Sequence, residues 1–385
     1  MAADKNGVVL DAEVADVSDG HTAPGSPKYR EITVLIPAYN EAAAIGQTLE
    51  SLREQTWSRS RIHVLVVDDC STDDTPKILA EFVKRHPEMN IRVLRPPANL
   101  GSKAKAQNFA LSHVSTELVL PLDGDTKLAP DYIERLLPVF DDPSVVVAAG
   151  CVLTQKQESM WEKARQLEYL LGFHWYRSIQ QMAGSITVCS GCCTVFRVDR
   201  LTDGFPETTL TEDIFFTWEQ HIAGFKAVYV PEAVAYAAEP NSLKYLSMQL
   251  KRWKCGWFHG FRLQYPRLLR KRPMVALWAG LQFLDTVLAP LVMALPILMF
   301  LVWHSPALRI GEWWLLGDLA TFWPPVLYGC WRRKYPVHKA ILSYPAWYAL
   351  KLVNFRWDMH MLVRELVLVP LHIVKPFTTY ERGKA

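Results

Sequence analysis

Apolar runs of strand length alternate with helical patterns through residues 31–150. Between the first two runs, Ile45, Leu49 and Leu52 recur at helical spacing, and Asn40 is the predicted cap of that helix. Buried strands separated by helices predict a mostly parallel, Rossmann-like sheet with helices on both faces. Ligands of such sheets bind beyond the carboxyl ends of the strands. The runs lie at 32–36, 62–67, 91–94, 118–122 and 145–149.

Longer helical patterns follow the strand region. Helices are predicted over about 158–182 and about 243–265, and the second is rich in aromatic and basic side chains. Residues 286–303 form an uncharged apolar run that is just long enough to cross a membrane. This run predicts one transmembrane span at about 280–303. Residues 313–330 predict a weaker second span, because charged and proline residues interrupt them.

The flanks of these two segments predict their orientation. Basic clusters at 267–272 and 332–334 are placed on the cytoplasmic side by the positive-inside rule. Residues 341–370 are apolar but carry charged side chains, so they are predicted to lie on the membrane surface. The alternative to the two spans is a buried pair of helices in a soluble protein.

The predicted organisation therefore has five parts. They are a disordered tail at 1–30, a catalytic domain at 31–240, an amphipathic interface helix at 241–272, a membrane region at 273–372 and a cytoplasmic tail at 373–385.

Composition narrows the class of protein. The chain has 385 residues, half of them hydrophobic, which suits two domains with a sizeable core. The net charge of +3 is too small to indicate a nucleic-acid-binding protein, which would have a strongly basic surface. Seven cysteines, an odd number, argue against a disulfide-stapled secreted protein. Because the chain starts without a secretory signal, its first domain is expected on the cytoplasmic side.

Carboxylates gather where the predicted strands end. The first strand leads into Pro37-Ala-Tyr-Asn-Glu41, the second into Asp68-Asp69 and the fourth into Asp123-Gly-Asp125. Such crowded carboxylates repel one another unless a cation or hydrogen-bond donors are present. An Asp-x-Asp turn offers oxygen ligands for Mg²⁺ or Mn²⁺. Substrate phosphates would complete the coordination shell of such an ion. Alone, the motif is equally compatible with a solvated turn.

Two further motifs each carry a functional and a structural interpretation. Gly101-Ser-Lys-Ala-Lys105 precedes a helix, where amides and ammonium groups can meet phosphate; otherwise its lysines are ordinary helix-start residues. Thr211-Glu-Asp213 precedes an apolar segment, where a carboxylate can have a raised pKa and act as a general base. The structural interpretation of that motif is a helix N-cap pair.

The aromatic and basic helix carries Gln249-Leu-Lys-Arg252-Trp253. Gln249 and Arg252 share a helix face, and Arg252 can clamp diphosphate oxygens with its guanidinium. Trp253 can stack on a sugar ring. The same helix is also expected to rest on anionic lipid, and the two roles are compatible.

In this order and spacing the motifs resemble those of the membrane-embedded family 2 glycosyltransferases. These include the hyaluronan, chitin, cellulose and poly-N-acetylglucosamine synthases and the nodulation chitooligosaccharide synthases. The resemblance covers residues 31–260 and includes Ser190-Gly191 with Phe196-Arg197. It implies a GT-A fold followed by interfacial and transmembrane helices. It also implies a protein of the cell membrane whose catalytic domain is cytoplasmic.

The resemblance implies a role for each motif. Asp213 is the catalytic base, and Asp123 and Asp125 hold the Mg²⁺ or Mn²⁺ ion. The nucleotide base is held by Tyr39 and Asp69. The rest of the nucleotide-sugar site is assigned to Pro37, Glu41, Lys103 or Lys105, Asp123, Gln249, Arg252 and Trp253. The acceptor is met by Ser190, Gly191, Cys192, Glu212 and Trp253, within a floor formed by Cys189 to Cys193.

The implied reaction is inverting transfer of a sugar from a nucleotide-sugar to a glycan acceptor, and the implied donor is a UDP-linked hexose or N-acetylhexosamine. The product is a β-linked polysaccharide or oligosaccharide. The alternative is transfer of a single sugar to a polyprenyl phosphate or glycolipid, and a non-catalytic nucleotide-sugar sensor is a third reading. The chain lacks the spans that often precede the catalytic domain in the family. A polymer channel would therefore need a homo-oligomer or a partner subunit, and a short product would need neither.

Overall fold

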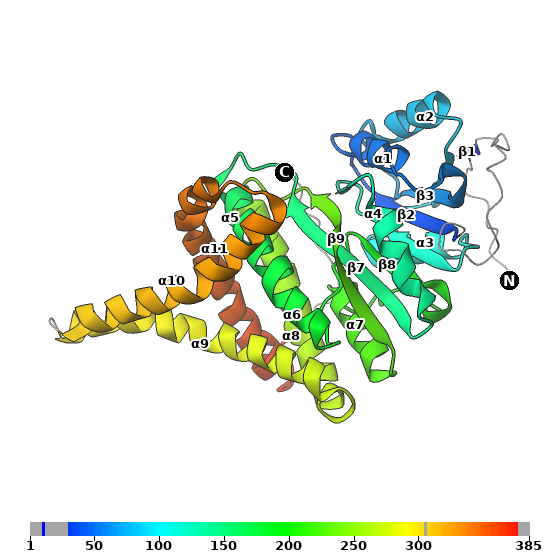
Figure 1. The fold of residues 1–385 in the computed structure, drawn as a ribbon. Helices are drawn as coiled ribbons and strands as arrows, with labels where there is room; N and C mark the ends of the chain where they lie inside the picture. The colour runs from blue at the N-terminus through cyan, green and yellow to red at the C-terminus, as the bar shows by residue number, and fades with distance from the viewer. Residues whose placement is uncertain (1–9, 12–29, 304–305, 376–385) are drawn as a thin grey trace. The chain divides into compact units, whose positions relative to one another are not determined.

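The computed structural model describes residues 10–11, 30–303 and 306–375 of the chain (Figure 1). Its contacts divide these residues into two units. The first unit holds the described residues up to Gln155 together with Val188–Ala238. The second holds Lys156–Thr187 and the described residues from Glu239 onward. The predicted catalytic domain at 31–240 thus differs from the first unit, because residues 156–187 belong with the later helices.

The first unit is built on a mixed sheet with strand order β1-β4-β3-β2-β5-β8-β7-β9-β6. The predicted parallel arrangement holds for β4, β3, β2 and β5, whereas β1, β6 and β8 pair antiparallel with their neighbours. The strands are β1 (Leu10–Asp11), β2 (Ile32–Ala38), β3 (Ile62–Asp68), β4 (Asn90–Leu94), β5 (Leu118–Pro121), β6 (Lys127–Leu128), β7 (Val145–Thr154), β8 (Thr194–Arg197) and β9 (Lys226–Ala237).

The register of the parallel strands brings the predicted motifs to one edge. Ala38 pairs with Asp68 at the ends of β2 and β3, and Leu35 pairs with Pro121 at the end of β5. The apolar side chains of these strands are buried, which explains their continuous hydrophobic runs. Residues 10–11 of the predicted tail pair with β4, and the other residues of that tail lie outside the described chain.

Helices cover both faces of the sheet (Figure 1). Because the chain steps outward from β2 to β4 and then returns to β5, right-handed crossovers place α1 and α2 on one face and α3 on the other. Asn40 does not cap α1: Ala44 precedes that helix, and Asn40 adopts a φ of 56° in the preceding loop. The helices are α1 (Ile45–Arg53), α2 (Thr75–Arg85), α3 (Lys103–Leu111), α4 (Tyr132–Leu136) and α7 (Glu212–Ile222), with 3-10 turns at Arg59–Arg61, Leu137–Asp141 and Val198–Arg200.

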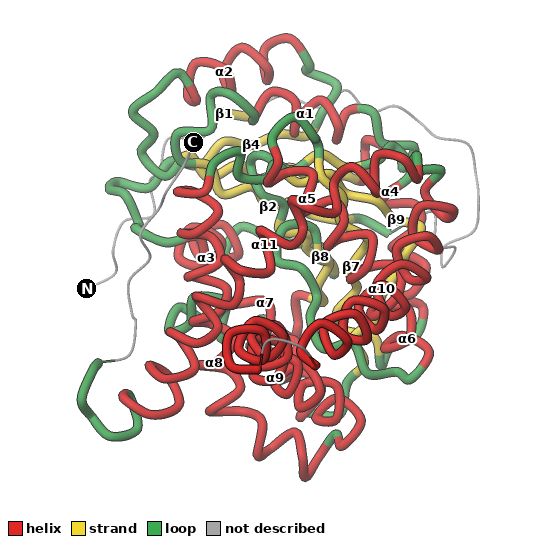
Figure 2. The backbone as a smooth tube through the Cα atoms, turned by 90° about the vertical axis from the view of Figure 1, so that its left-hand side faces the viewer, coloured by secondary structure: helices red, strands yellow, loops and turns green. Residues whose placement is uncertain are grey.

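The described part of the second unit is helical (Figure 2). The predicted helix at 158–182 is continuous but contains a π-helical turn, and the prolines at 324 and 325 lie inside α10 without ending it. Its elements are α5 (Met160–Leu171), a π turn (Gly172–Tyr176), α6 (Arg177–Met182), α8 (Leu243–Lys271), α9 (Pro273–Trp303), α10 (Pro306–Arg333), α11 (Val337–Val363) and a second π turn (Arg364–Leu368).

Two apolar clusters hold these helices together. In one, Leu167 and Leu170 of α5 pack with Phe322 and Val326 of α10 and with Trp347 of α11. This packing is the reason that residues 156–187 group with the C-terminal helices. In the other cluster, Leu246 and Leu250 of α8 pack with Ala164 of α5 and Leu350 of α11.

The predicted membrane segments coincide with α9, α10 and α11. Among the described residues, no helix is both long enough and apolar enough to qualify as a membrane span. The side chains of residues 289–315, which include most of the first predicted span, lie outside the described part.

Candidate active site

The loops that follow β2 and β3 are tied to each other by hydrogen bonds. The Asn40 amide donates to Ser71 Oγ at 3.0 Å, and the Glu41 amide donates to Thr75 Oγ1 at 2.8 Å. The Asp69 amide donates to the Ala38 carbonyl at 2.8 Å. These bonds satisfy backbone groups beyond the strand ends, and they place Tyr39 and Asp69 in adjoining loops.

The two aspartates of the second motif have different surroundings. Asp68 accepts a hydrogen bond from the Ser71 amide and pairs with Arg95, so it fixes the loop. Asp69 is 1% exposed, and its Oδ1 accepts from the Leu100 amide at 2.7 Å. Asp69 therefore joins the loop after β3 to the segment that leads into α3.

The Asp123-Gly-Asp125 turn is held from both sides. The Asp123 amide donates to the Cys192 carbonyl at 3.2 Å, and Thr48 Oγ1 donates to the Gly124 carbonyl at 2.9 Å. A Cβ at Gly124 would lie 3.0 Å from Glu41 Cγ. Glycine thus lets Glu41 pack against the turn, which joins the first and third motifs.

Lys103 is the cation at the centre of the site. Its Nζ lies 2.7 Å from Asp123 Oδ1 and 3.4 Å from Glu212 Oε1, and it donates to the Gly191 carbonyl at 2.9 Å. Lys105, the alternative that the spacing leaves open, is exposed, and its amide is capped by the Ser102 hydroxyl. The structure therefore brings Lys103, and not Lys105, to the carboxylates.

Asp213 lies in the first turn of α7, beside Gly191. Its Oδ2 accepts from the Gly191 amide at 3.0 Å, and its Oδ1 accepts from the Ile214 amide at 2.9 Å. Burial raises the pKa of Asp213, and the nearby negative charge of Glu212 raises it further. The Ile214 and Gly191 amides and the Lys103 charge act in the opposite direction. A carboxylate with a raised pKa in a fixed position is suited to accept a proton.

The predicted acceptor floor adjoins this carboxylate. Ser190 and Gly191 precede a bridge between Cys193 and Leu122, which ties the floor to the segment after β5 that leads into Asp123. The Cys192 thiol donates to Cys193 Sγ at 3.7 Å, and this contact and burial raise its pKa well above the ordinary range. The thiol of Cys192 is therefore protonated at neutral pH and adds no charge to the site.

Gln249, Arg252 and Trp253 of the last motif lie in the second unit, on α8. Their place at the nucleotide-sugar site stays a prediction. Within the unit, Trp253 packs against the cluster formed by Leu246, Leu250 and their neighbours. Gln249 Oε1 is buried without a hydrogen-bond partner among the described residues.

The carboxylate turn fits a divalent cation that shares its ligands with a phosphate. Asp123 and Asp125 supply hard oxygen donors from one short turn, and Asp123 already faces a cation, Lys103. Among the described residues, no group of three or more protein ligands surrounds a common point. A metal held here would therefore complete its shell with diphosphate oxygens and water, as Mg²⁺ commonly does.

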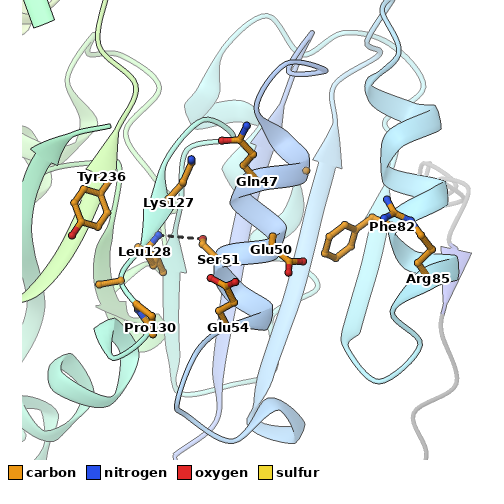
Figure 3. A pocket seen from close by; sticks show the side chains of 12 residues that line it. Gln47, Glu50, Ser51, Glu54, Phe82, Arg85, Lys127, Leu128, Pro130 and Tyr236 are labelled. Carbon is orange, nitrogen blue, oxygen red and sulfur yellow. Dashed lines mark hydrogen bonds between the residues drawn. The ribbon is translucent and has the colours of Figure 1, made fainter. Parts of the chain in front are cut away.

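An open pocket of about 590 Å³ lies elsewhere in the first unit (Figure 3). It runs along α1, and Glu50, Phe82, Lys127 and Tyr236 are among its lining residues. None of the predicted site residues lines it. The carboxylate cluster at the strand ends, which carries groups able to do chemistry, is therefore the better candidate site.

Gln155 is a site residue that the sequence motifs did not reveal. Its Nε2 donates to the Asp125 carbonyl and to the Tyr236 carbonyl, so it holds one end of the carboxylate turn. Gln155 belongs to no motif. The feature of the sequence that could have indicated its role is its position directly after the ten buried residues of β7.

The mixed sheet is GT-A-like, and comparison with known sequences identifies the family. The profile described as Glycosyl transferase family 2 matches residues 33–205. The chain is 32% identical over 291 residues to an N-acetylglucosaminyltransferase of Sinorhizobium fredii, covering 72% of this chain and 68% of that protein. The chain belongs to glycosyl transferase family 2 and is a glycosyltransferase.

Other relatives are similar over a comparable region. A hyaluronan synthase of Streptococcus pyogenes is 28% identical, covering 66% of this chain and 63% of that protein. The chain thus spans about two thirds of the length of these relatives. A mannosyltransferase from Pyrobaculum calidifontis, in complex with GDP-Man and Mn²⁺, has a TM-score of 0.59 at 22% identity. It covers 83% of this chain and 91% of that structure, and the likeness is one of fold.

Proposed function

We propose that this glycosyltransferase moves a sugar from a UDP-linked donor to a glycan hydroxyl with inversion, and so forms a β-linked oligosaccharide or polysaccharide. The observation that carries the proposal is the cluster in which Lys103 lies between Asp123 of the carboxylate turn and Glu212 beside Asp213. It supports the proposal because Asp213, the proposed base, adjoins a lysine cation and a turn with two carboxylates that could bind a metal.

The proposed reaction is a single displacement. The acceptor oxygen forms a bond to the anomeric carbon while the bond from that carbon to the diphosphate oxygen breaks. Asp213 takes the hydroxyl proton, and the leaving nucleoside diphosphate keeps the bonding electrons. Lys103, and Arg252 from the second unit, are proposed to neutralise its charge. A metal ion bound by Asp123 and Asp125 would supply further charge stabilisation.

The relatives support the choice of donor and metal. Proteins similar over most of the chain are called N-acetylglucosaminyltransferase and hyaluronan synthase, so N-acetylglucosamine is the first sugar proposed. The structural neighbour was solved with Mn²⁺ and a nucleotide-sugar, which supports Mn²⁺ or Mg²⁺ at the carboxylate turn of this chain.

The decisive experiment measures nucleotide release and product size together. The purified protein, in detergent or nanodiscs with Mn²⁺ or Mg²⁺, is given UDP- and GDP-sugars with no acceptor, with an N-acetylglucosamine tetramer or with a polyprenyl phosphate. Metal-dependent release from UDP-N-acetylglucosamine with elongation of the tetramer is expected. Transfer of one sugar to a polyprenyl phosphate, with no elongation, would instead identify the lipid-carrier reaction. UDP binding without turnover on any acceptor would favour a sensor.

We also propose that α8 to α11 attach the protein to the cell membrane, with the first unit on the cytoplasmic side. Supporting features are the apolar run at 286–303, the basic cluster at 267–272, and exposed Leu277, Leu281 and Leu284 on α9. Flotation with vesicles containing anionic lipid tests this. The protein is expected to float with the vesicles and to lose this binding when the three leucines become serine, whereas a protein that never floats would contradict the proposal.

A further inference from the structure

Arg165 places a buried guanidinium group inside the second unit. The side chains of Arg165 and of its partner Glu239 are each 2% exposed, and Arg165 Nε donates to Glu239 Oε2 at 3.0 Å. Arg165 Nη2 donates to the Tyr169 hydroxyl at 2.9 Å, and that hydroxyl donates in turn to Glu239 Oε1. Glu168 pairs with Nη1. The guanidinium is therefore fixed in position and plane by groups on several sides.

The same guanidinium lies over the indole ring of Trp253. Its Cζ is 4.6 Å from the Trp253 ring and 4.8 Å from the Tyr169 ring. The attraction between a cation and an aromatic face strengthens on removal from water, and here the guanidinium is buried while Trp253 is half-buried. The indole of Trp253 also packs against the aliphatic cluster of α8, α5 and α11, which limits its remaining freedom.

A buried ion pair is weak evidence for stability, because removing two charges from water costs free energy that hydrophobic packing would not. The network of Arg165 therefore calls for another explanation. The network constrains Trp253, a half-buried aromatic residue. Gln249 lies one turn earlier on the same face of α8. Gln249 Oε1 is buried with no described partner, so this face holds an acceptor ready for a further hydrogen-bond donor.

We propose that Arg165, clamped by Glu239 and Tyr169, is a positioning residue that fixes the indole plane of Trp253 for stacking on the acceptor saccharide. The proposal rests on the proposed function, because it gives Trp253 a sugar acceptor. Sugar rings present C–H faces that stack on a correctly oriented indole, so a tilted ring would weaken acceptor binding. Donor binding and the role of Asp213 are expected to be unaffected, because a tilted indole changes only the surface that Trp253 offers to the acceptor.

A spectroscopic test examines the positioning without using turnover. The full-length protein is labelled with 5-fluorotryptophan, and the Trp253 signal is assigned by its absence in Trp253→Phe. In Arg165→Lys the charge remains but the planar fork is lost, so the signal is expected to broaden or split. Arg177→Lys is the matched control, because Arg177 stacks on Phe173 at 4.3 Å in the same helical segment. A Trp253 signal that changes equally in both variants, or in neither, would overturn the proposal.

A kinetic test then examines the consequence. Arg165→Lys is expected to raise KM for the N-acetylglucosamine tetramer about 10-fold, with kcat and the donor KM little changed. In a Trp253→Ala background the same substitution should have no further effect, because the two residues act as one unit. An undiminished effect in that background would contradict the positioning role.

Glu239→Gln provides a second variant if Arg165→Lys fails to fold. It loosens the guanidinium without changing α5, and the same acceptor KM effect and the same loss of that effect with Trp253→Ala are expected. A parent protein that turns over no donor would refute the proposed function, while the fluorine signal would still decide whether Arg165 positions Trp253.

Discussion

In the first unit, the site residues lie on loops after buried strands and at the starts of α3 and α7, and hydrogen bonds and ion pairs hold them in place. In the second unit, Gln249, Arg252 and Trp253 lie on the 29-residue helix α8, and side-chain packing holds Trp253 in place. The first arrangement depends on charge: Lys103 faces Asp123 and Glu212. The second depends on aromatic contact, as where Arg165 covers Trp253.

Because of this difference, the two units are expected to respond differently to substitutions. Charge interactions in the first unit act directly on the reacting groups, so an isosteric change that removes a charge should alter the chemistry and leave the fold intact. In the second unit, the same kind of change should act on binding through the orientation of a ring.

Asp213→Asn should reduce turnover by about 10²- to 10⁴-fold, the range that a positioned general base contributes. The amide keeps the shape of the carboxylate but cannot take the acceptor proton. Nucleotide release and UDP binding are measured side by side, and binding should be retained. Asp199→Asn, a change at an exposed carboxylate of the same unit, is the control. Turnover equal to that of the parent would remove Asp213 from the mechanism.

Asp125→Ala should lower turnover by about 10²-fold or more, because charge stabilisation by a metal amounts to several kcal/mol. The half-saturating Mn²⁺ concentration should also rise, since one carboxylate ligand is lost. Titration of activity with Mn²⁺ measures both. Asp131→Ala, outside the turn, should leave the titration unchanged. An unaltered metal response in Asp125→Ala would mean that the metal is held elsewhere.

Lys103→Met should reduce kcat/KM by about 10- to 100-fold, the size expected when a hydrogen bond to a charged group is lost. It should also move the acidic limb of the pH profile to higher pH. A base must lose its proton before it acts, and the Lys103 charge lowers the pKa of Asp213. Removing that charge raises this pKa, so the pH range of activity narrows at its acidic end.

Lys105→Met is the matched control for Lys103→Met, because Lys105 is an exposed residue of the same helix. Its pH profile should follow that of the parent. A shift of the acidic limb in Lys105→Met, or its absence in Lys103→Met, would contradict the assignment of the cation.

Gly191→Ala should lower turnover several-fold, whereas Gly172→Ala in the second unit should have no effect on it. A Cβ at Gly191 would lie 3.3 Å from the Cβ and Oδ2 atoms of Asp213, so the base must shift by a few tenths of an ångström. A Cβ at Gly172 meets nothing within 4 Å. Crowding of this kind costs about 1–3 kcal/mol. Thermal unfolding of both variants separates a displaced base from a destabilised fold.

The sequence predicted the parallel core well because each strand has a continuous apolar run that only a sheet covered on both faces can bury. It also predicted that motifs from three strands meet, since parallel strands end at one edge. It did not predict the antiparallel β8 and β6, which depend on long-range pairing. The prediction that Asn40 caps α1 was wrong. Its side chain instead accepts a hydrogen bond from the Thr72 amide, so a contact with a distant loop replaces the local cap.

The central sheet of the first unit could be deduced from the chain, because it follows from local periodicity. The family and the carboxylates at the sheet edge could be deduced as well, because they follow from short motifs in a fixed order. Three contacts became evident from the folded chain alone. Lys103, and not Lys105, faces Asp123. Gln155 donates to the Asp125 carbonyl, and Arg165 lies over the ring of Trp253. Each of these choices depends on which side chains distant in the chain become neighbours. Neighbours of that kind are set by how whole elements pack, and no single segment encodes them.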